Sequence, residues 1–355
     1  MDTPINNDSL RFWDATTTPL RCGDIIAEAP SVKTFRFAAS DGSWFRYRPG
    51  QFITVELPVP AGTVYRTYTL SSSPTRPQLC SITVKAQGNS IGSRWLLESF
   101  KVGGTLKAFG PAGDFTLQDA PTKLLLVSGG SGITPMLSMT RHLFDTAAKV
   151  DIRFLHFGRT PSDLLCRGEL ESMAASWPAL KLRWVVEDDS SQPWSGAAGR
   201  IDRAMLSLLC PDVASRDVFC CGPEPFMKAT REAVTAIAGS LKRYQEESFQ
   251  PAAPAPAPAA AAAAPAVAEC EVSFTKSQRS AKIGGNATVL SAAQAAGLAI
   301  PYACQMGLCG SCRVMKVAGD VTMVHDGGIS DDEIAEGYIL ACCSKPASAA
   351  IELDL

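Results

Sequence analysis

Three cysteines lie within nine residues of one another in the stretch PYACQMGLCGSC at residues 301–312. They follow the spacing C-x4-C-x2-C, and a fourth cysteine comes after 29 further residues. Plant-type 2Fe–2S clusters are held by four thiolates with this spacing, the fourth being distant in sequence. The sequence therefore predicts a 2Fe–2S centre whose iron ligands are Cys304, Cys309, Cys312 and Cys342.

Other uses of close thiols fit this stretch less well. Cys309 and Cys312 could form a thioredoxin-like redox pair, but the strand-turn-helix context of such a pair is lacking. A four-cysteine zinc site is the second alternative, and a lone, distant fourth cysteine fits it poorly. Gly307 and Gly310 permit the tight turns that wrapping a cluster requires. Cys343 is expected to be a bystander, because four thiolates suffice.

A glycine-rich turn in LLLVSGGSGITPM, residues 124–136, is typical of a phosphate-binding loop. An apolar strand runs into Gly130 and Gly132, and a helix follows, so backbone N–H groups and the positive helix end can meet a phosphate. Thr134 is predicted to cap that helix, and Pro135 suits its first turn. The stretch is not the G-x-G-x-x-G fingerprint, because proline replaces the last glycine.

A second turn supports this interpretation. In CCGPEPFM, residues 220–227, another apolar strand ends at Cys221 and turns through Gly222 and Pro223 before a helix. The carboxyl ends of parallel strands share one sheet edge, where open α/β folds bind their ligands. We therefore predict that both turns form one dinucleotide site.

The stretch YRTYTLSSS at residues 65–73 is a third candidate. Alternation along a strand places Arg66 and Tyr68 on one face. A cation there could meet a phosphate while the ring packs on a flavin. Taken alone, this is an ordinary amphipathic strand, and the structural interpretation stays open at this point.

The surrounding pattern indicates which elements position these residues. Residues 22–117 contain short β-rich runs with proline and glycine between them, which predicts an antiparallel barrel or sandwich. From residue 119, apolar runs alternate with helical patterns, which predicts a parallel sheet with crossover helices. The expected strands are 124–127, 152–157, 182–186 and 218–221, and the expected helices are 135–146, 164–177 and 225–239.

The C-terminal part predicts a small α+β domain after a linker. Residues 251–268 consist almost entirely of alanine and proline and cannot form a core. They are expected to be an extended tether, either passive or allowing the last domain to move between two docking places. ECEVSFTKSQRSAKIG indicates a hairpin, and ATVLSAAQAAG a helix that ends at Gly297. The cysteine cluster then lies in a β-grasp-like domain.

Composition limits the class of protein. The 355 residues are 46% apolar and 19% charged, with a net charge of −2, which argues against a nucleic-acid binder. No apolar run approaches a membrane span, and the first twenty residues lack a signal peptide. The cytoplasm is the expected compartment, where thiols serve metals, catalysis or packing. Residues 269–355 hold ten acidic and six basic residues, so this domain could dock on a basic surface.

Together the motifs resemble the ferredoxin–NADP⁺ reductase superfamily, in its three-domain oxygenase-reductase branch. The matching motifs are R-x-Y-[ST]-x-x-S at 66–72, G-G-x-G-I-T-P at 129–135, C-G-P at 221–223, E-x-F at 247–249 and the four cysteines. RTYTLSSSP and GSRWLLESFKVGGTL look most like FAD-containing reductases of Rieske oxygenases that demethylate glycine betaine. They are also similar to the reductase that serves the hybrid-cluster protein.

The resemblance implies a multidomain chain. An N-terminal extension spans 1–21, an antiparallel β-barrel flavin domain 22–118 and an α/β parallel-sheet NAD(P)H domain 119–250. The linker spans 251–268, and an α+β, β-grasp 2Fe–2S ferredoxin domain spans 269–355.

The resemblance also implies residue roles. Catalytic contacts would come from Thr69 at the hydride-accepting flavin nitrogen, from Cys221 near the nicotinamide and from Phe249 over the flavin. The flavin would be bound by Arg66, Tyr68, Thr69, Ser72, Ile91, Gly92 and Ser93. The dinucleotide would be bound by Gly130, Gly132, Thr134, Pro135, Gly222 and Pro223.

The resemblance favours FAD as the flavin and NADH as the electron donor, with FMN and NADPH as alternatives. The second flavin motif often reads G-x-x-S, whereas here Gly88 is followed by Asn89, Ser90 and Ile91. A 2′-phosphate would need clustered cations, for which only Arg159 and Arg167 are available past the second strand of the nucleotide sheet.

These cofactors together predict a function. NADH gives up two electrons at once and a 2Fe–2S cluster takes one, so a flavin that handles both belongs between them. We expect an NADH-dependent reductase for a separate terminal Rieske oxygenase, one that acts on glycine betaine or a related quaternary amine. Alternatives are a reductase for a hybrid-cluster protein or a di-iron monooxygenase, a redox-sensing iron–sulfur protein, and a flavin enzyme with a vestigial ferredoxin tail.

Overall fold

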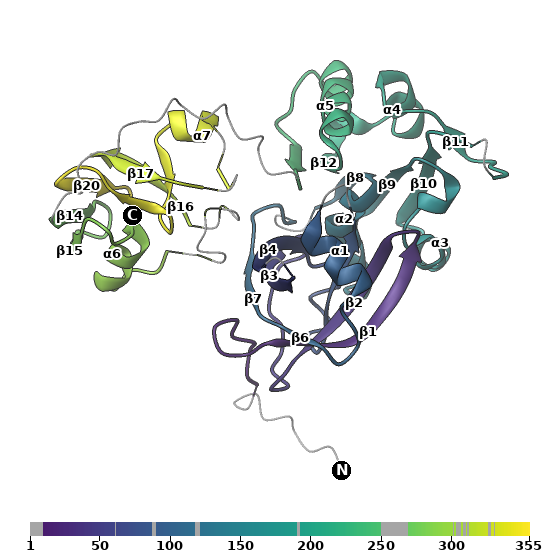
Figure 1. The fold of residues 1–355 in the computed structure, drawn as a ribbon. Coiled ribbons are helices and arrows are strands. Elements are labelled where there is room, and N and C mark those ends of the chain that lie inside the picture. Colours follow the sequence, from purple (N-terminus) through teal and green to yellow (C-terminus); the bar gives the residue numbers. More distant parts are fainter. Residues whose placement is uncertain are drawn as a thin grey trace, which may run out of the picture. The chain divides into compact units, whose positions relative to one another are not determined.

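The chain divides into two compact units, Met1–Phe249 and Gln250–Leu355 (Figure 1). The computed structural model describes residues 10–60, 62–86, 90–117, 121–189, 192–249, 269–300, 302, 307, 310, 312–325, 328–329 and 331–355. No helix within these ranges combines the length and the apolar character that crossing a bilayer requires. The predicted linker at 251–268 lies outside the described residues.

The first unit begins with two antiparallel sheets that curl around one core. The first has the order β5-β2-β1-β6 and the second β4-β3-β7. Their strands are β1 (Leu20–Ala29), β2 (Val32–Ala39), β3 (Phe52–Val59), β4 (Gly62–Thr69), β5 (Cys80–Lys85), β6 (Thr105–Leu106) and β7 (Ala108–Ala112). Helix α1 (Ile91–Glu98) covers one end, where its buried Leu96 joins Phe35, Phe37 and Ile53 in the core. This arrangement is the predicted curled antiparallel domain.

The rest of this unit is a parallel sheet with helices on both faces. Its order is β11-β10-β9-β8-β12-β13, formed by β8 (Lys123–Gly129), β9 (Asp151–Gly158), β10 (Leu180–Val186), β11 (Ala197–Ala198), β12 (Asp217–Cys221) and β13 (Tyr244–Glu247). The helices are α2 (Ile133–Asp145), α3 (Arg167–Ser176), α4 (Arg203–Leu209) and α5 (Glu224–Ala238), with short 3-10 turns η2 (Gly130–Gly132), η3 (Pro161–Asp163) and η4 (Val213–Ser215).

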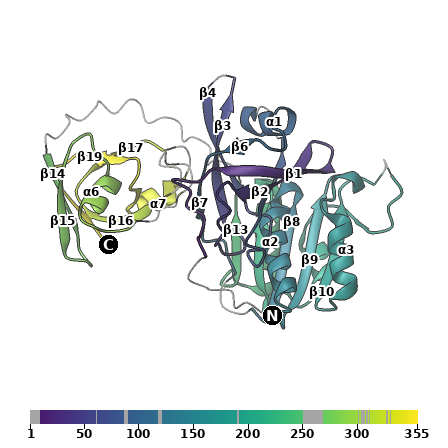
Figure 2. The ribbon, with the colours of Figure 1, turned by 90° about the horizontal axis from the view of Figure 1, so that it is seen from below.

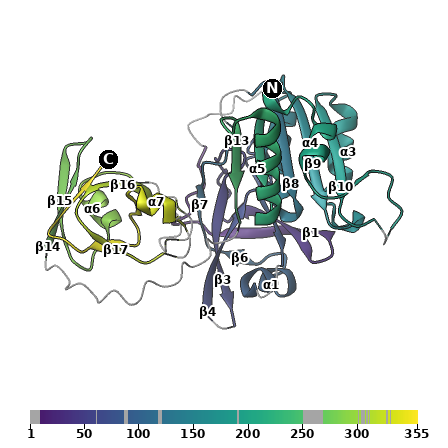
Figure 3. The same cartoon turned by 90° about the horizontal axis from the view of Figure 1, so that it is seen from above.

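Alternate residues of β8 bury against opposite faces of this sheet. Leu124 and Leu126 belong to the core that contains α2 and α3, whereas Leu125 and Val127 belong to the core that contains α4 and α5. Figure 2 shows α2 and α3 on one face, and Figure 3 shows α4 and α5 on the other. Strands buried on both faces explain the continuous apolar runs in the sequence.

The second unit is a small α+β domain. Its main sheet has the order β15-β14-β20-β16-β18, and β17 pairs with β19. The elements are β14 (Glu269–Phe274), β15 (Arg279–Gly284), β16 (Arg313–Ala318), β17 (Val321–Met323), β18 (Tyr338–Leu340), β19 (Ser344–Pro346), β20 (Ala350–Leu353), α6 (Val289–Ala295) and α7 (Asp331–Ala335). The predicted helix α6 is capped by Thr288 and is followed by Gly297 at φ +71°. The three-part fold class predicted from the sequence is thus confirmed.

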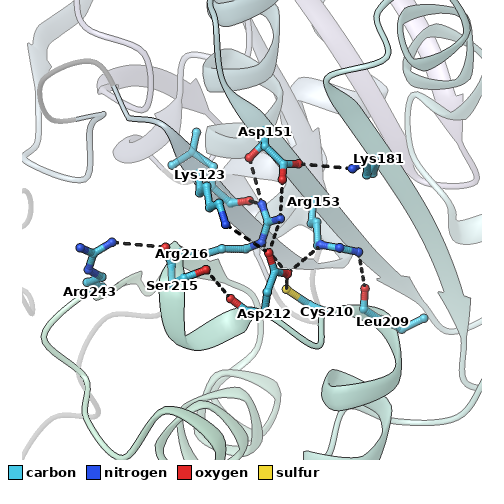
Figure 4. A network of polar contacts seen from close by, with 11 residues as sticks. Lys123, Asp151, Arg153, Lys181, Leu209, Cys210, Asp212, Ser215, Arg216 and Arg243 are labelled. Carbon is cyan, nitrogen blue, oxygen red and sulfur yellow. Dashed lines mark hydrogen bonds and ion pairs between the residues drawn. The ribbon is translucent and has the colours of Figure 1, made fainter.

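A buried arginine joins the amino ends of the sheet strands, at the edge opposite the two predicted glycine turns (Figure 4). Arg216 directly precedes β12, and its side chain is fully buried. Its Nη1 donates to the carbonyl oxygens of Leu124 and Asp151 at 3.1 and 3.0 Å. Its other guanidinium N–H groups contact the carboxylates of Asp151 and Asp212 at 2.7 to 2.9 Å. Hydrogen bonding from Arg216 holds the pKa of Asp212 well below its usual range.

Replacing this arginine should destabilise the fold markedly. Arg216→Ala removes the donor from the carbonyl oxygens of Leu124 and Asp151 and the most closely bound partner from the two carboxylates. Asp212 keeps Arg153 and Lys123 nearby, and Asp151 keeps Lys181. Because the carboxylates still touch water, we expect a loss of about 3 kcal/mol of unfolding free energy, the low end of the cost of a broken buried pair. Urea unfolding of the purified protein would measure it. The matched control is Arg243→Ala, since Arg243 is exposed and lies 3.8 Å from Asp217, so the change should be below about 1 kcal/mol.

The same network sets the direction of a pH dependence. The pKa values of Asp151 and Asp212 are lowered from 3.8, so the stabilisation is complete above that pH and is lost as pH falls through the folded-state values. The difference between wild type and Arg216→Ala should therefore shrink in acid. Equal losses in the Arg216 and Arg243 variants at neutral pH would contradict this role.

Candidate functional site

The two predicted turns meet at the carboxyl edge of the parallel sheet. Strand β8 ends at Gly129, η2 follows, and α2 begins at Ile133. A Cβ atom on Gly132 would lie 2.2 Å from the carbonyl oxygen of Cys221 and 2.7 Å from the nitrogen of Gly222. Only glycine permits this approach, so the first turn rests directly on the second.

The prediction that Thr134 caps α2 is wrong. Gly132 occupies the N-cap position, because η2 runs straight into the helix, and no side chain caps it. The Thr134 hydroxyl instead donates to the carbonyl oxygen of Ser131 at 3.2 Å. Pro135 does lie in the first turn, where its missing N–H costs no hydrogen bond.

The flavin-motif strand β4 lies against the first turn of α1. The hydroxyl groups of Tyr68 and Ser93 are 3.1 Å apart, and burial raises the pKa of Tyr68 to about 12. A Cβ atom on Gly92 would lie 3.2 Å from Cγ of Arg66, so glycine keeps the helix close to the strand. The first N–H groups of a helix have no partner within it. Together with the Arg66 guanidinium they suit a pyrophosphate, and the residues therefore fit FAD.

Ser72 makes protein contacts with both its side chain and its carbonyl group. Its hydroxyl is 2.7 Å from the Tyr47 hydroxyl and accepts from the Ser81 N–H at 2.9 Å. Its carbonyl oxygen accepts from Ser138 of α2. A direct contact of Ser72 with the cofactor stays a prediction.

Three strand ends bring Thr69, Cys221 and Glu247 together. Thr69 ends β4, and Cys221 and Glu247 are parallel partners at the ends of β12 and β13. Burial raises the pKa of the Glu247 carboxyl to about 8, and a hydrogen bond from Thr69 opposes part of that shift. Burial and then the neighbouring Glu247 raise the pKa of the Cys221 thiol well above its ordinary value. Two of the three predicted catalytic residues, Thr69 and Cys221, thus lie close to the carboxyl group of Glu247.

Glu247 was not predicted as a functional residue. Its Oε2 is buried and has no hydrogen-bond partner among the residues that the structure describes, although the residue as a whole is partly exposed. A carboxyl group with a pKa of about 8 holds a proton at neutral pH. The only sequence signal was its place in the E-x-F motif. Phe249, two residues later, is 41% exposed, and its contact with the flavin stays a prediction.

The arginines that could have favoured a 2′-phosphate both have acidic partners. Arg159 lies 4.0 Å from Asp163, and Arg167 donates to Glu171 at 2.7 Å. Glu187 and Asp188 follow β10 at the same carboxyl edge, and their N–H groups donate to the carbonyl oxygens of Gly158, which ends β9, and of Arg159. The two acidic residues at this edge, of which Glu187 pairs with Arg200 at 3.3 Å, disfavour a second phosphate there and so favour NADH over NADPH.

The ferredoxin unit places two of the four predicted iron ligands together. The N–H of Cys342 donates to Sγ of Cys312 at 3.4 Å, and both residues are buried. Gly307 and Gly310 have φ angles of +71° and +70°, so the tight turns predicted around the cluster are present. Cys304 and Cys309 lie outside the described residues. What is described fits a cluster wrapped by this loop.

The sequence matches three domain families in this order. Residues 22–117 match the oxidoreductase FAD-binding domain, 126–232 the oxidoreductase NAD-binding domain and 274–347 the 2Fe-2S iron-sulfur cluster binding domain. The stachydrine N-demethylase reductase subunit Stc4 of Rhizobium meliloti is 45% identical over 341 residues, which are 95% of this chain and 96% of that protein. The chain belongs to the oxygenase-reductase branch of the ferredoxin–NADP⁺ reductase superfamily.

Other relatives align over nearly the whole chain. The glycine betaine monooxygenase reductase subunit of Chromohalobacter salexigens is 44% identical over 97% of each chain. The NADH oxidoreductase HCR of Escherichia coli is 33% identical over 91% of this chain and 93% of its own. The solved structure of phthalate dioxygenase reductase is 25% identical, with a TM-score of 0.57, and covers 96% of this chain and 98% of that one. The predicted cofactors FAD, NADH and a 2Fe–2S cluster are confirmed for an oxidoreductase of this branch.

Proposed function

We propose that this oxidoreductase is the reductase component of a Rieske-type monooxygenase that demethylates glycine betaine or a related quaternary amine. The observation that carries the proposal is identity of 40 to 45%, over 95 to 97% of the chain, to reductase subunits of a stachydrine demethylase and of glycine betaine monooxygenases. We place the activity in the cytoplasm, where thiols stay reduced.

One set of residues would bind the flavin, and a second set would bind the dinucleotide that reduces it. Bound FAD supplies an acceptor for the hydride of NADH and a donor of single electrons to the 2Fe–2S cluster. Arg66, Tyr68 and the first turn of α1 would hold the FAD, while the turn around Gly132 would hold the dinucleotide. Thr69 would hydrogen-bond the flavin edge, with the protonated Glu247 beside it as a local source of a proton. Cys221 would pack against the nicotinamide and help to exclude water.

The test is reconstitution of a complete reaction. The purified chain is mixed with a candidate Rieske oxygenase, NADH, oxygen and either glycine betaine or stachydrine, and formaldehyde and the demethylated amine are measured. We expect product in proportion to NADH consumed, and much slower turnover with NADPH. Rapid reduction of cytochrome c without product from any quaternary amine would overturn the proposal. Turnover with a hybrid-cluster protein instead would favour the alternative role as the reductase of such a protein.

Glu247 gives a prediction about pH. Above a pH of about 8 its carboxyl becomes charged beside the site where hydride arrives, so flavin reduction by NADH should slow as pH rises through that value. In Glu247→Gln this fall should be absent. Since the raised pKa penalises the charged form in the fold, stability should also decline as pH rises from 4.5 towards about 8.

The measurement is the rate of anaerobic flavin bleaching by NADH from pH 6 to 9. Glu246→Gln is the matched control, because Glu246 is the neighbouring carboxylate and already accepts from Arg231 and Tyr244. An unchanged fall near pH 8 in Glu247→Gln, or its disappearance in Glu246→Gln, would contradict this assignment.

A further inference from the structure

One face of helix α2 contacts the segment that leaves the flavin strand. Ser138, Arg141 and Asp145 are spaced three and four residues apart, so they lie on the same side of the helix. Each of them has a partner within residues 71–76, shortly after β4. Two halves of the unit that bind different ligands are therefore joined along a single helix face.

Each of the three residues makes a specific polar contact. The Ser138 hydroxyl donates to the carbonyl oxygen of Ser72 at 2.7 Å. Nη1 of Arg141 donates to the carbonyl oxygen of Ser71, and its other N–H groups donate to Glu169 at 2.8 and 2.6 Å. Arg141 is thus held in place from α3 while it reaches the barrel.

The third contact is a two-pronged ion pair. Asp145 accepts from Nε and Nη2 of Arg76 at 3.0 and 2.6 Å and from the Thr75 hydroxyl at 2.5 Å. Ser138 is completely buried, and the side chains of Arg141 and Asp145 are each 13% exposed. The Arg76 side chain is 64% exposed, so what distinguishes this pair is its two parallel N–H···O bonds, which fix its geometry.

This contact links the two parts of the candidate site, namely the glycine turn before α2 and the end of β4. Helix α2 starts from the glycine turn that contacts Cys221, and the segment that α2 contacts begins two residues after Thr69. The position of the glycine turn relative to the end of β4 therefore depends on how α2 packs on residues 71–76.

We propose that Ser138, Arg141 and Asp145 are positioning residues that set the approach of the nicotinamide to the flavin. The step they serve breaks the C4–H bond of NADH, transfers both electrons with the hydrogen to the flavin and leaves NAD⁺. This inference rests on the NADH-to-flavin half of the proposed function and not on the terminal acceptor. A displacement of 1 Å can cost about 100-fold in rate, so loosening the contacts should slow transfer about tenfold or more.

The test uses the full-length protein with its cofactors. Ser138→Ala/Asp145→Ala removes two of the three contacts without leaving Glu169 unpaired. The matched control is Glu171→Ala, which removes a carboxylate–arginine pair confined to α3. Rescue is tested by combining Asp145→Arg with Arg76→Asp, which reverses the ion pair. FAD content, the KM for NADH, the single-turnover rate of flavin reduction and the long-wavelength absorbance of the stacked rings are measured for each.

The expected result is slower flavin reduction and weaker long-wavelength absorbance in the double variant. FAD content and the KM for NADH should stay within about twofold, because a positioning defect acts on the reaction step. Glu171→Ala should behave as wild type, and the reversed pair should recover most of the rate lost by Asp145→Arg alone. Unchanged transfer and absorbance in the double variant, or no recovery in the reversed pair, would overturn the inference. Failure of the wild type itself to be reduced by NADH would overturn the proposed function as well.

Discussion

Cys342→Ser is expected to abolish electron delivery to protein acceptors while leaving NADH oxidation by ferricyanide almost unchanged. Cys342 is buried beside Cys312, and its own N–H donates to that sulfur, so the substitution removes one of the two predicted iron ligands that the structure describes. A 2Fe–2S cluster requires four such ligands. Changes outside the ligand shell of metal sites cost up to about 100-fold, and loss of a ligand should cost at least that much. Ferricyanide takes electrons from the flavin directly.

The matched control is the adjacent thiol. Cys343 is only partly buried, and four other cysteines already supply the predicted ligands. Cys343→Ser should therefore keep the visible absorbance and the electron paramagnetic resonance signal of the reduced cluster, and it should reduce cytochrome c at close to the wild-type rate. Wild-type cytochrome c reduction by Cys342→Ser, or loss of the cluster in Cys343→Ser alone, would contradict the assigned ligand set.

The fold was predictable because its signals are local. Apolar runs such as Leu124–Val127 fell within strands that are only a few residues longer, and the helix expected at 225–239 is α5, Glu224–Ala238. Parallel strands buried on both faces and helices at the 3.6-residue period leave strong patterns in a single sequence. The cap at Thr134 was mispredicted because η2 runs directly into α2, so the helix starts at Ile133, two residues earlier than a cap at Thr134 implies.

The candidate site was predictable only where a residue type carries its own chemistry. The cysteine spacing and the glycine turns can be recognised in the sequence, whereas Glu247 looks like any surface glutamate at the end of a short strand. Its burial arises from the pairing of β13 with β12 and from the approach of Thr69, which is 178 positions away in the chain. Such a raised pKa is a property of the assembled fold and has no counterpart in local sequence.

The polar contacts between distant elements were not predictable for the same reason. Arginines are rarely buried, so nothing in the sequence distinguishes Arg216 or Arg141 from the exposed arginines. Both become structural because several carbonyl and carboxylate groups converge on one guanidinium, and those groups come from other elements. Convergence of this kind appears only once the strand order is known.

Gly132→Ala is expected to reduce NADH-dependent flavin reduction about 100-fold, since it should displace the predicted dinucleotide-binding turn around Gly132 by a good fraction of an ångström or more. The added Cβ would lie 2.2 Å from the carbonyl oxygen of Cys221 and 2.4 Å from its carbonyl carbon, which are backbone atoms that cannot rotate away. The glycine turn and the Cys221 turn must therefore separate. Overpacking of this kind also costs about 1 to 3 kcal/mol of unfolding free energy.

Gly168→Ala is the matched control, because Gly168 lies in α3 and an added Cβ there meets nothing within 4 Å. It should raise stability by up to about 1 kcal/mol, as alanine does in a helix, without changing activity. Stopped-flow flavin reduction, with FAD and iron content measured on the same samples, separates the two effects. Because the flavin motif and the cysteines lie on other elements, Gly132→Ala should retain both cofactors. A variant that keeps both cofactors and reduces its flavin at the wild-type rate would show that the dinucleotide binds away from this turn.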